Sequence, residues 1–226
     1  TWAAGAAQWD EDRLIERRDA LRALLKKYGQ KHLAETRVPF NDVSLWQHSY
    51  AVAAIFKALL AGCLLRGNLK GLISGDDFVN GSLMHARQRL ALLALRWDDA
   101  ALLERSVRSY DIVGRRAALH ELADKMKHLV EDRLCLGNEV YRDLHGICFL
   151  IPDLKHAKAS EEEQNCLLRL CNSTAQLCDD PRLFGGALSW KLQLKSCGLR
   201  LTDLLSLWQV PFEEARHVVI QAEPRK

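Results

Sequence analysis

The chain has 226 residues, of which 48% are hydrophobic and 27% are charged, a composition typical of a folded globular protein and not of a disordered one. Its length allows one large domain or two small ones, and either can bury a sizeable core. The formal net charge of +3 is too small to indicate a nucleic-acid partner by itself, so a local basic patch would be needed.

The number and spacing of the cysteines indicate the redox state of the compartment in which the protein folds. There are seven, an odd number without a CxxC pair, which argues against the disulfide framework of a secreted protein and favours a reducing cytoplasm. Cys166, Cys171 and Cys178 fall in one expected helix, but steps of five and seven residues do not converge on one metal as i, i+4 spacing does. We therefore do not predict a zinc site.

The amino-terminal end shows no secretory signal, because its small residues soon give way to the charged Asp10-Glu11-Asp12. The first residue is Thr, so we expect a processed, truncated or internal portion of a longer chain. The apolar run Ala51 to Leu65, broken only by Lys57, is shorter than the roughly 20 residues that span a bilayer. We expect a buried helix there and no membrane partner.

Residues 1–66 are expected to form a helical region. Leu14, Leu21 and Leu25 recur at helical spacing between Asp10 and about Ala34, which predicts an amphipathic helix. A second helix, capped by Asn41 or Asp42, is expected to reach Leu65 and to be mostly buried after Tyr50, where it is apolar nearly all round.

Residues 67–88 are expected to be a linker, because glycines recur there and the other signals weaken. Gly75-Asp76-Asp77 in this segment superficially resembles a catalytic turn. Glycine and aspartate are also ordinary turn residues, and the flanking sequence does not alternate like paired strands. We favour the ordinary turn.

Residues 89–200 carry an alternation of strand and helix signals. The apolar run Arg89 to Trp97 predicts a strand covered on both faces, with Asp98 at its carboxyl end. A helix is expected from Val113 to Leu134. Two strands, Glu139 to Arg142 and Ile147 to Ile151, are expected around a turn at Asp143 to Gly146.

The remaining signals complete the unit. A capping box at Ser160 opens an expected helix to about Cys178, and Leu188 to Leu194 alternates like an open-faced or edge strand. The resulting order, βαββαβ, predicts an α+β protein with a ferredoxin-like palm preceded by the small helical region. Residues 201–226 are expected to form a helix, Leu201 to Trp208, that leads outward, and a tail.

Two segments resemble a known family. Asn41 to Tyr50, followed by Ala53-Ala54-Ile55, resembles the end of the HD nuclease domain in the large subunit of type III CRISPR interference complexes, the Cas-ten-like superfamily. Gly137 to Asp143, followed by Gly146 to Asp153, resembles the palm hairpin of its Csx-eleven branch. Together they cover about 30 positions in the family's order.

The resemblance implies a fragment in which an HD-domain remnant joins the first palm of that subunit. Such subunits belong to crRNA-guided complexes that recognise invading RNA and act as a nuclease, a cyclic oligoadenylate synthetase or both. It therefore implies CRISPR complex subunits, crRNA and target RNA as partners, and a role in antiviral defence.

The HD motif is incomplete. An HD nuclease needs an adjacent His-Asp pair among its metal ligands, and this chain has no His-Asp dipeptide. Gln47 precedes His48 where family members usually have Asp. His48 is thus a weak candidate ligand, and a hydrogen-bonded histidine of a packed helix is the favoured reading.

Asp98 and Asp143 are the candidate metal ligands of the palm, because two-metal nucleotidyl transfer needs converging carboxylates. If the palm were catalytic, Mg or Mn with ATP would be its cofactors. The family's active hairpin carries Gly-Gly-Asp-Asp, whereas this one reads Tyr141-Arg142-Asp143-Leu144, and we expect Arg142 to neutralise Asp143. The favoured reading is structural, with Asp98 capping a helical turn and Asp143 closing the hairpin.

The densest basic group comprises Arg105, Arg108, Arg115 and Arg116. It is either a solvated face or a contact to RNA or nucleotide phosphate, the latter helped by the helix amino terminus expected near Gly114. Three functions stay open: a non-catalytic scaffold palm, which we favour, a metal-dependent nucleotidyl cyclase that makes cyclic oligoadenylate from ATP, and a nucleotide-binding regulatory domain.

Overall fold

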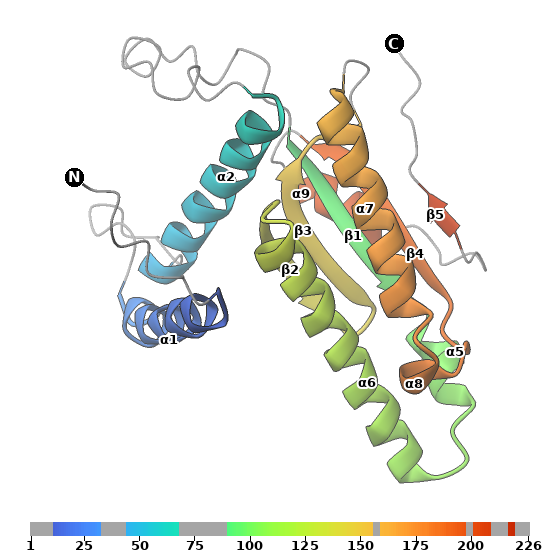
Figure 1. Ribbon diagram of the computed structural model, residues 1–226. Helices are drawn as coiled ribbons and strands as arrows, with labels where there is room; N and C mark the ends of the chain where they lie inside the picture. Colours follow the sequence, from blue (N-terminus) through green and yellow to red (C-terminus); the bar gives the residue numbers. More distant parts are fainter. Residues whose placement is uncertain are drawn as a thin grey trace, which may run out of the picture. The chain divides into compact units, whose positions relative to one another are not determined.

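The computed structural model describes residues 11–32, 44–67, 90–155, 159–197, 201–208 and 217–219. The chain is an α+β protein (Figure 1). It divides into two compact units, Thr1–Ala53 and Ala54–Lys226, and the division falls inside the second helix. The Gly75-Asp76-Asp77 turn and most of the expected linker lie outside the described residues. The domain limits drawn from the sequence stay predictions.

The first unit holds helix α1, Glu11–Gly29, and the first turns of helix α2, Leu45–Leu65. α1 begins where predicted but ends at Gly29, before the predicted end near Ala34. The amide of Leu45 then donates to the carbonyl of His32 at 2.7 Å. α2 begins later than predicted. The hydroxyl of Ser44 accepts from the amide of Gln47 at 3.2 Å, so Ser44 is the capping residue.

The second unit is built on a five-stranded sheet with the order β2-β3-β1-β4-β5. β1, β3 and β4 pair antiparallel, as do β2 and β3, whereas β5 runs parallel to β4. β5 was not predicted. It covers part of β4, so the prediction of an edge strand there is wrong at Lys191 to Gln193. The strands are β1 Leu90–Trp97, β2 Asn138–Asp143, β3 Gly146–Pro152, β4 Trp190–Cys197 and β5 His217–Val219.

Helices fill the two connections in which the sequence predicted them. Between β1 and β2 lie α5, Asp99–Glu104, α6, Ser109–His128, and a π-helical turn η2, Leu129–Arg133. Between β3 and β4 lie α7, Glu161–Cys178, and α8, Pro181–Phe184. The order of strands and helices along residues 89–200 is therefore the expected one.

Local signals set the helix ends. α7 has the predicted capping box, because the hydroxyl of Ser160 accepts from the amide of Glu163 at 3.2 Å and the amide of Ser160 donates to the Glu163 carboxylate at 2.8 Å. α6 begins four residues before the predicted Val113. The carboxylate of Asp111 accepts from the amide of Arg108 at 2.9 Å and so closes its first turn.

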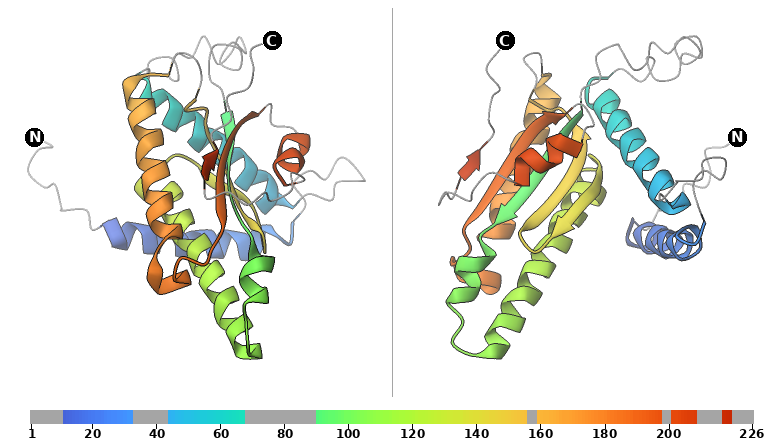
Figure 2. Two further views of the ribbon diagram at one scale, coloured as in Figure 1. Left: turned by 90° about the vertical axis from the view of Figure 1, so that its right-hand side faces the viewer. Right: turned by 180° about the vertical axis from the view of Figure 1, so that it is seen from behind.

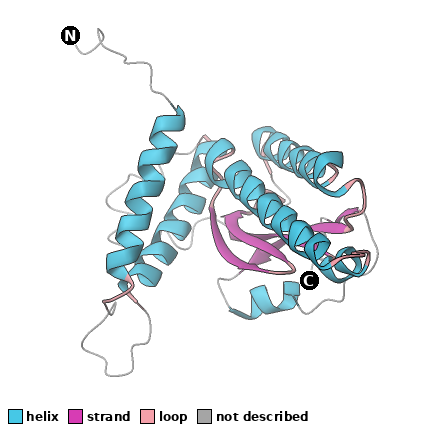
Figure 3. Ribbon diagram, turned by 90° about the horizontal axis from the view of Figure 1, so that it is seen from below, coloured by secondary structure: helices cyan, strands magenta, loops and turns pink. Residues whose placement is uncertain are grey.

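The two faces of β1 pack against different layers, as Figures 2 and 3 show. Leu93, Leu95 and Trp97 belong to the core beneath α6 and α7. Leu92 and Ala94 point to the opposite face, where Ala58 of α2 and Leu207 of helix α9, Leu201–Trp208, cover them. All eight residues of β1 are buried, which confirms a strand covered on both faces.

Two expectations about these outer helices are wrong. α9 does not lead outward, because Leu204, Leu207 and Trp208 pack back onto the sheet. α2 is not mostly buried after Tyr50. Val52 and Phe56 are 53% and 57% exposed, and the fully buried residues of α2 are confined to a narrow stripe of small side chains. The stripe consists of Ala54, Ala58, Ala61, Gly62 and Cys63.

α2 is also longer than the apolar run read from the sequence. With 21 residues it is long and apolar enough to cross a membrane by length and composition, a test that core helices of soluble proteins also pass. Within the described part of the chain no other helix has this property. A cytoplasmic location stays a prediction.

Candidate functional site

The end of the central strand lies beside the β2–β3 turn. The amide of Trp97 donates to the carbonyl of His145 at 3.0 Å, and its indole N–H donates to the carbonyl of Leu144 at 2.7 Å. These two bonds join β1 to the hairpin. Asp98, which follows β1, and Asp143, which ends β2, are thereby brought to the same end of the sheet.

Asp98 caps the short helix α5. Its Oδ1 accepts from the amide of Ala101 at 2.9 Å, which is the capping role weighed for it from the sequence. The next residue, Asp99, forms a contact of 2.6 Å between its Oδ1 and Nδ1 of His145. The Asp99 carboxylate thus ties α5 to the hairpin turn, and the Asp98 carboxylate caps the amino terminus of α5.

Asp143 accepts hydrogen bonds from three donors. Its Oδ1 accepts from the amide of His145 at 2.8 Å, which closes the turn. Its Oδ2 accepts from the Tyr141 hydroxyl at 3.1 Å and from the indole N–H of Trp208 at 2.7 Å. The negative charge of Asp143 raises the pKa of the Tyr141 hydroxyl above its ordinary value, with burial and the hydrogen bond adding to the shift.

Trp208 brings α9 into this site. The Trp208 ring meets the Tyr141 ring edge-on, with 5.0 Å between the two centroids. The Arg96 guanidinium lies 5.8 Å from the centroid of the Trp208 ring. Arg96 also donates from Nη1 to the carbonyl of Leu207 at 3.0 Å. Burial lowers the pKa of the Arg96 guanidinium, and the nearby Asp143 carboxylate opposes that shift. The site therefore holds a buried cation, an aromatic pair and a carboxylate.

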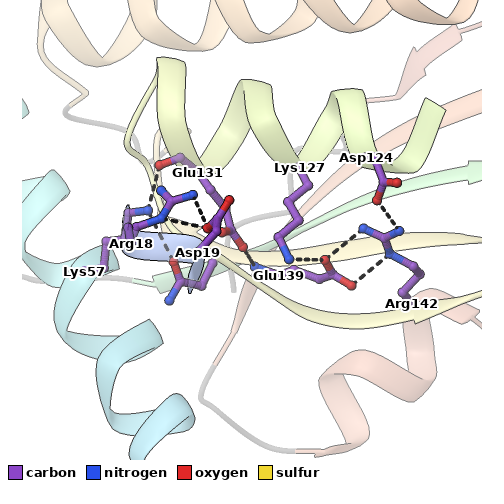
Figure 4. Close-up of polar contacts among 9 residues, drawn as sticks. Arg18, Asp19, Lys57, Asp124, Lys127, Glu131, Glu139 and Arg142 are labelled. Atoms are coloured by element: carbon purple, nitrogen blue, oxygen red, sulfur yellow. Dashed lines mark hydrogen bonds and ion pairs between the residues drawn. The ribbon is translucent and has the colours of Figure 1, made fainter. Parts of the chain in front are cut away.

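Arg142 does not neutralise Asp143, which corrects the prediction from the sequence. It donates from Nε to Glu139 at 2.9 Å and from Nη1 to Asp124 of α6 at 2.7 Å, while Lys127 approaches the same Glu139 at 3.3 Å (Figure 4). Neighbouring strand residues point to opposite faces. Arg142 therefore joins the α6 side of the sheet, and Asp143 joins the α9 side.

The carboxylates do not fit a two-metal site as they stand. A carboxylate has about four lone-pair positions, and hydrogen-bond donors already use three of those of Asp143. Asp98 is committed to its helix cap. Over the described ranges, no group of three or more His, Cys, Asp or Glu side chains has an arrangement that could hold a metal ion.

His48 lies on the exposed side of α2, in the first unit. The arginines separate into different roles. Arg115 donates to the carbonyls of Leu102 and Arg105 and so fastens the α5–α6 turn. Arg105 reaches the carbonyl of Ala187 at 3.5 Å.

Arg108 lies over the Tyr110 ring at 5.8 Å, and it donates to the hydroxyl of that residue at 2.5 Å. Arg116 is exposed. Because α6 begins at Ser109, Arg115 and Arg116 lie in its second turn, and the predicted phosphate site at the helix amino terminus is misplaced.

A groove of about 970 Å³ lies between α6 on one side and α7 and α8 on the other. Its charges are largely paired within the fold, as in Lys125 with Glu121 at 2.8 Å and Arg182 with Asp180 at 3.0 Å. It does not include Asp98 or Asp143.

Sequence reasoning missed Arg96, Tyr141 and Trp208. Arg96 is the one charged residue inside an apolar strand, and that is a signal which could have singled it out. Trp208 lies 65 residues from Asp143, and no local pattern connects them.

Comparison with known proteins adds no relative. No protein-family model matches the chain, and no curated protein is significantly similar to it. The class that the fold itself defines is an α+β protein whose mainly antiparallel sheet carries helices on both faces.

Proposed function

We propose that this chain is the non-catalytic first palm, with HD-remnant helices, of a CRISPR-associated large-subunit-like protein. It would act as a scaffold within an RNA-guided antiviral ribonucleoprotein. The strand order β2-β3-β1-β4, with α6 and α7 on one face, supports a ferredoxin-like palm. The two segments that resemble the family supply the rest of the proposal, since a fold alone does not determine function.

The observation that carries the non-catalytic role is the use of Asp143 within the fold. A catalytic carboxylate must be free to bind a cation, whereas Asp143 holds the hairpin turn, Tyr141 and α9 together. Asp98 is similarly used to start α5. These two residues therefore support the shape of the palm, and this shape is what a scaffold retains.

The exposed tip between α5 and α6 is the part of this palm that suits RNA. Arg108 and Arg116 are exposed there, and the neighbouring Tyr110 and Val113 are 63% and 67% exposed. Arginines contact phosphates and exposed aromatic rings stack on bases. We place the contact with guide or target RNA at this tip, and not at Arg115, which is engaged within the turn.

The test uses the full-length protein in its complex. Asp98→Asn and Asp143→Asn are combined, because Asn keeps the capping geometry and one acceptor oxygen but not the charge that a cation needs. Complex assembly and RNA retention are expected to be unchanged, as is any product made from ATP with Mg or Mn. The control is the wild-type complex, measured in the same way, whose second palm is intact.

Loss of the ATP-derived product in the double variant, with assembly intact, would overturn the scaffold role and establish the cyclase alternative. Loss of assembly with no change in melting temperature would instead show that the carboxylates contact a partner. If the complex contains no guide RNA at all, the CRISPR assignment itself is wrong.

A further inference from the structure

One exposed face of α6 connects the α5–α6 tip with the groove between α6, α7 and α8. Residues three or four positions apart lie on the same face of a helix. Tyr110, Gly114 and Ala117 follow one another at this spacing, and Ala117 also lines the groove. Asp124 and His128 continue the same face inside the groove. The tip and the groove are therefore two ends of one surface, which we call the α6 surface.

The middle of the α6 surface is low and open. Gly114 has no side chain, and no other part of the fold lies within 4 Å of the position that a Cβ would take there. Ala117 is small and exposed, and the neighbouring Val113 is 67% exposed. From Tyr110 to His128 the helix rises about 27 Å. An extended ligand fits along this length without displacing a side chain of the core.

The tip end presents an aromatic ring in a fixed position. Arg108 lies over the Tyr110 ring and donates to its hydroxyl, while the ring stays 63% exposed. The backbone of the tip is fastened by Arg115, which donates to the carbonyls of Leu102 and Arg105. A fixed, exposed ring beside an arginine suits the stacking of a nucleobase, with the arginine near the adjoining phosphate.

The groove end suits the negative charge of a phosphate backbone. Each of the three carboxylates that line it is already paired with a cation of the fold. The pairs are Lys125 with Glu121 at 2.8 Å, Arg142 with Asp124 at 2.7 Å and Arg182 with Asp180 at 3.0 Å. Arg133 also lines the groove, is exposed, and has no hydrogen bond or ion pair within the described part of the chain. Its positive charge is thus available to an anionic ligand.

We propose that the α6 surface binds single-stranded RNA. One base stacks on Tyr110, the strand crosses Gly114 and Ala117, and its phosphate groups enter the groove toward Arg133. A duplex is excluded, because its bases are stacked on one another and cannot lie on the Tyr110 ring. The inference rests on the RNA contact proposed at the tip, and it adds that the RNA is single-stranded and where its chain runs.

The first test measures the stacked base. Fluorescence anisotropy follows the binding of an unstructured RNA octanucleotide to the full chain without other subunits. Tyr110→Ala is expected to weaken binding by about tenfold or more, whereas Tyr110→Phe, which keeps the ring, should stay within about twofold of the wild type. Tyr28→Ala is the matched control, because Tyr28 is 57% exposed on α1 and its loss should leave the affinity unchanged.

The second test measures the course of the strand. Ala117→Leu raises the floor between the tip and the groove, and it is expected to weaken octanucleotide binding by about fivefold or more at an unchanged melting temperature. Ala20→Leu, at an exposed alanine of α1, is the control and should have no effect on binding. Arg133→Gln is expected to reduce the slope of the logarithm of the binding constant against the logarithm of the salt concentration by about 0.7.

Unchanged affinity of both Tyr110→Ala and Ala117→Leu would overturn the proposal, as would the absence of octanucleotide binding or equal binding of an RNA duplex. Competition by an octaglutamate peptide as strong as that by the octanucleotide would instead identify the groove as a site for an acidic protein. These outcomes are separate from those of the scaffold role. A complex without guide RNA rejects the CRISPR assignment but not the α6 surface, and normal RNA binding by the two variants rejects the α6 surface alone.

Discussion

At the scale of single residues, the charges of this protein are used to hold elements together. Glu163 is fully buried, and its carboxylate accepts from Nε of Arg66 at 2.7 Å and from the amide of Ser160 at 2.8 Å. A capping box is usually exposed to solvent, whereas this one is buried together with an ion pair. The sequence showed the box but not its burial.

Glu163→Ala is therefore expected to lower the free energy of unfolding by about 3 kcal/mol, because it leaves the Arg66 charge without that carboxylate and removes half of the cap. Chemical denaturation monitored by circular dichroism measures the change. Glu162→Ala is the matched control, since Glu162 is exposed in the same helical turn and should change stability by less than about 0.5 kcal/mol. Equal effects of the two substitutions would contradict the burial of the pair.

Tyr141 gives a pH prediction. Its pKa in the folded protein is raised above the ordinary 10.0, first by the charge of Asp143. A raised folded-state pKa stabilises the fold fully at pH values below the unfolded pKa, and this contribution is lost as the pH rises through the folded pKa. The stability that Tyr141 contributes should therefore fall in the alkaline range above pH 10.

Ultraviolet titration of tyrosinate, with Tyr141→Phe subtracted, measures this pKa directly. Asp143→Asn should return it toward the ordinary value. A Tyr141 pKa that is the same in both proteins would mean that the carboxylate does not act on the hydroxyl.

At the scale of elements, the α5–α6 connection shows how one arginine can shape a turn while its neighbour stays in solvent. Arg115 reaches back to two carbonyl groups, those of Leu102 and Arg105, whereas Arg116 is exposed. Charged donors to carbonyls contribute more stability than exposed charges do. Adjacent arginines that look equivalent in the sequence thus have different roles.

Arg115→Gln is expected to lower the free energy of unfolding by about 1.5 kcal/mol, because the turn loses its charged donors. Arg116→Gln should change stability by less than about 0.5 kcal/mol but should reduce the salt dependence of the proposed RNA binding. Denaturation curves and binding titrations at several salt concentrations measure the two effects. If Arg115→Gln reduced the salt dependence and Arg116→Gln did not, Arg115 would be the residue that contacts phosphate.

At the scale of the whole molecule, the part of α2 from Ala54 onward belongs to the same compact unit as the sheet and packs against it. Ala58 is fully buried against β1 and its neighbours, and the Lys57 amine donates to the carbonyl of Glu131 at 2.7 Å and to Asn138 at 3.2 Å (Figure 4). The sequence placed this segment in the helical region and not with the palm. Small residues allow its backbone to approach the strands closely.

Ala58→Asp is expected to lower the free energy of unfolding by about 3 kcal/mol or more, because it buries a charge against an apolar face. Leu64→Asp is the control on the same helix, since Leu64 is 54% exposed and its replacement should change stability much less. Thermal unfolding of both variants compares them. Similar melting temperatures would show that this part of α2 does not cover the sheet.

Local patterns were enough for the order of elements and for several of their ends. The apolar run of β1, the turn of the β2–β3 hairpin, the Ser160 box and the helix at Leu201–Trp208 all lie where the sequence predicted them. Each depends on residues close in the chain, whose propensities and hydrogen bonds act locally. The sequence also brought forward Asp98 and Asp143 as a pair.

The surroundings of these carboxylates depend on long-range packing. The return of α9 onto the sheet, the partnership of Trp208 with Asp143 and the turn of Arg142 toward α6 all join residues distant in sequence. Strand pairing sets which face each residue occupies, and one residue of register exchanges the faces. Local patterns therefore indicate where a site could be, and long-range packing sets the partners of its carboxylate, an aromatic ring and a hairpin turn.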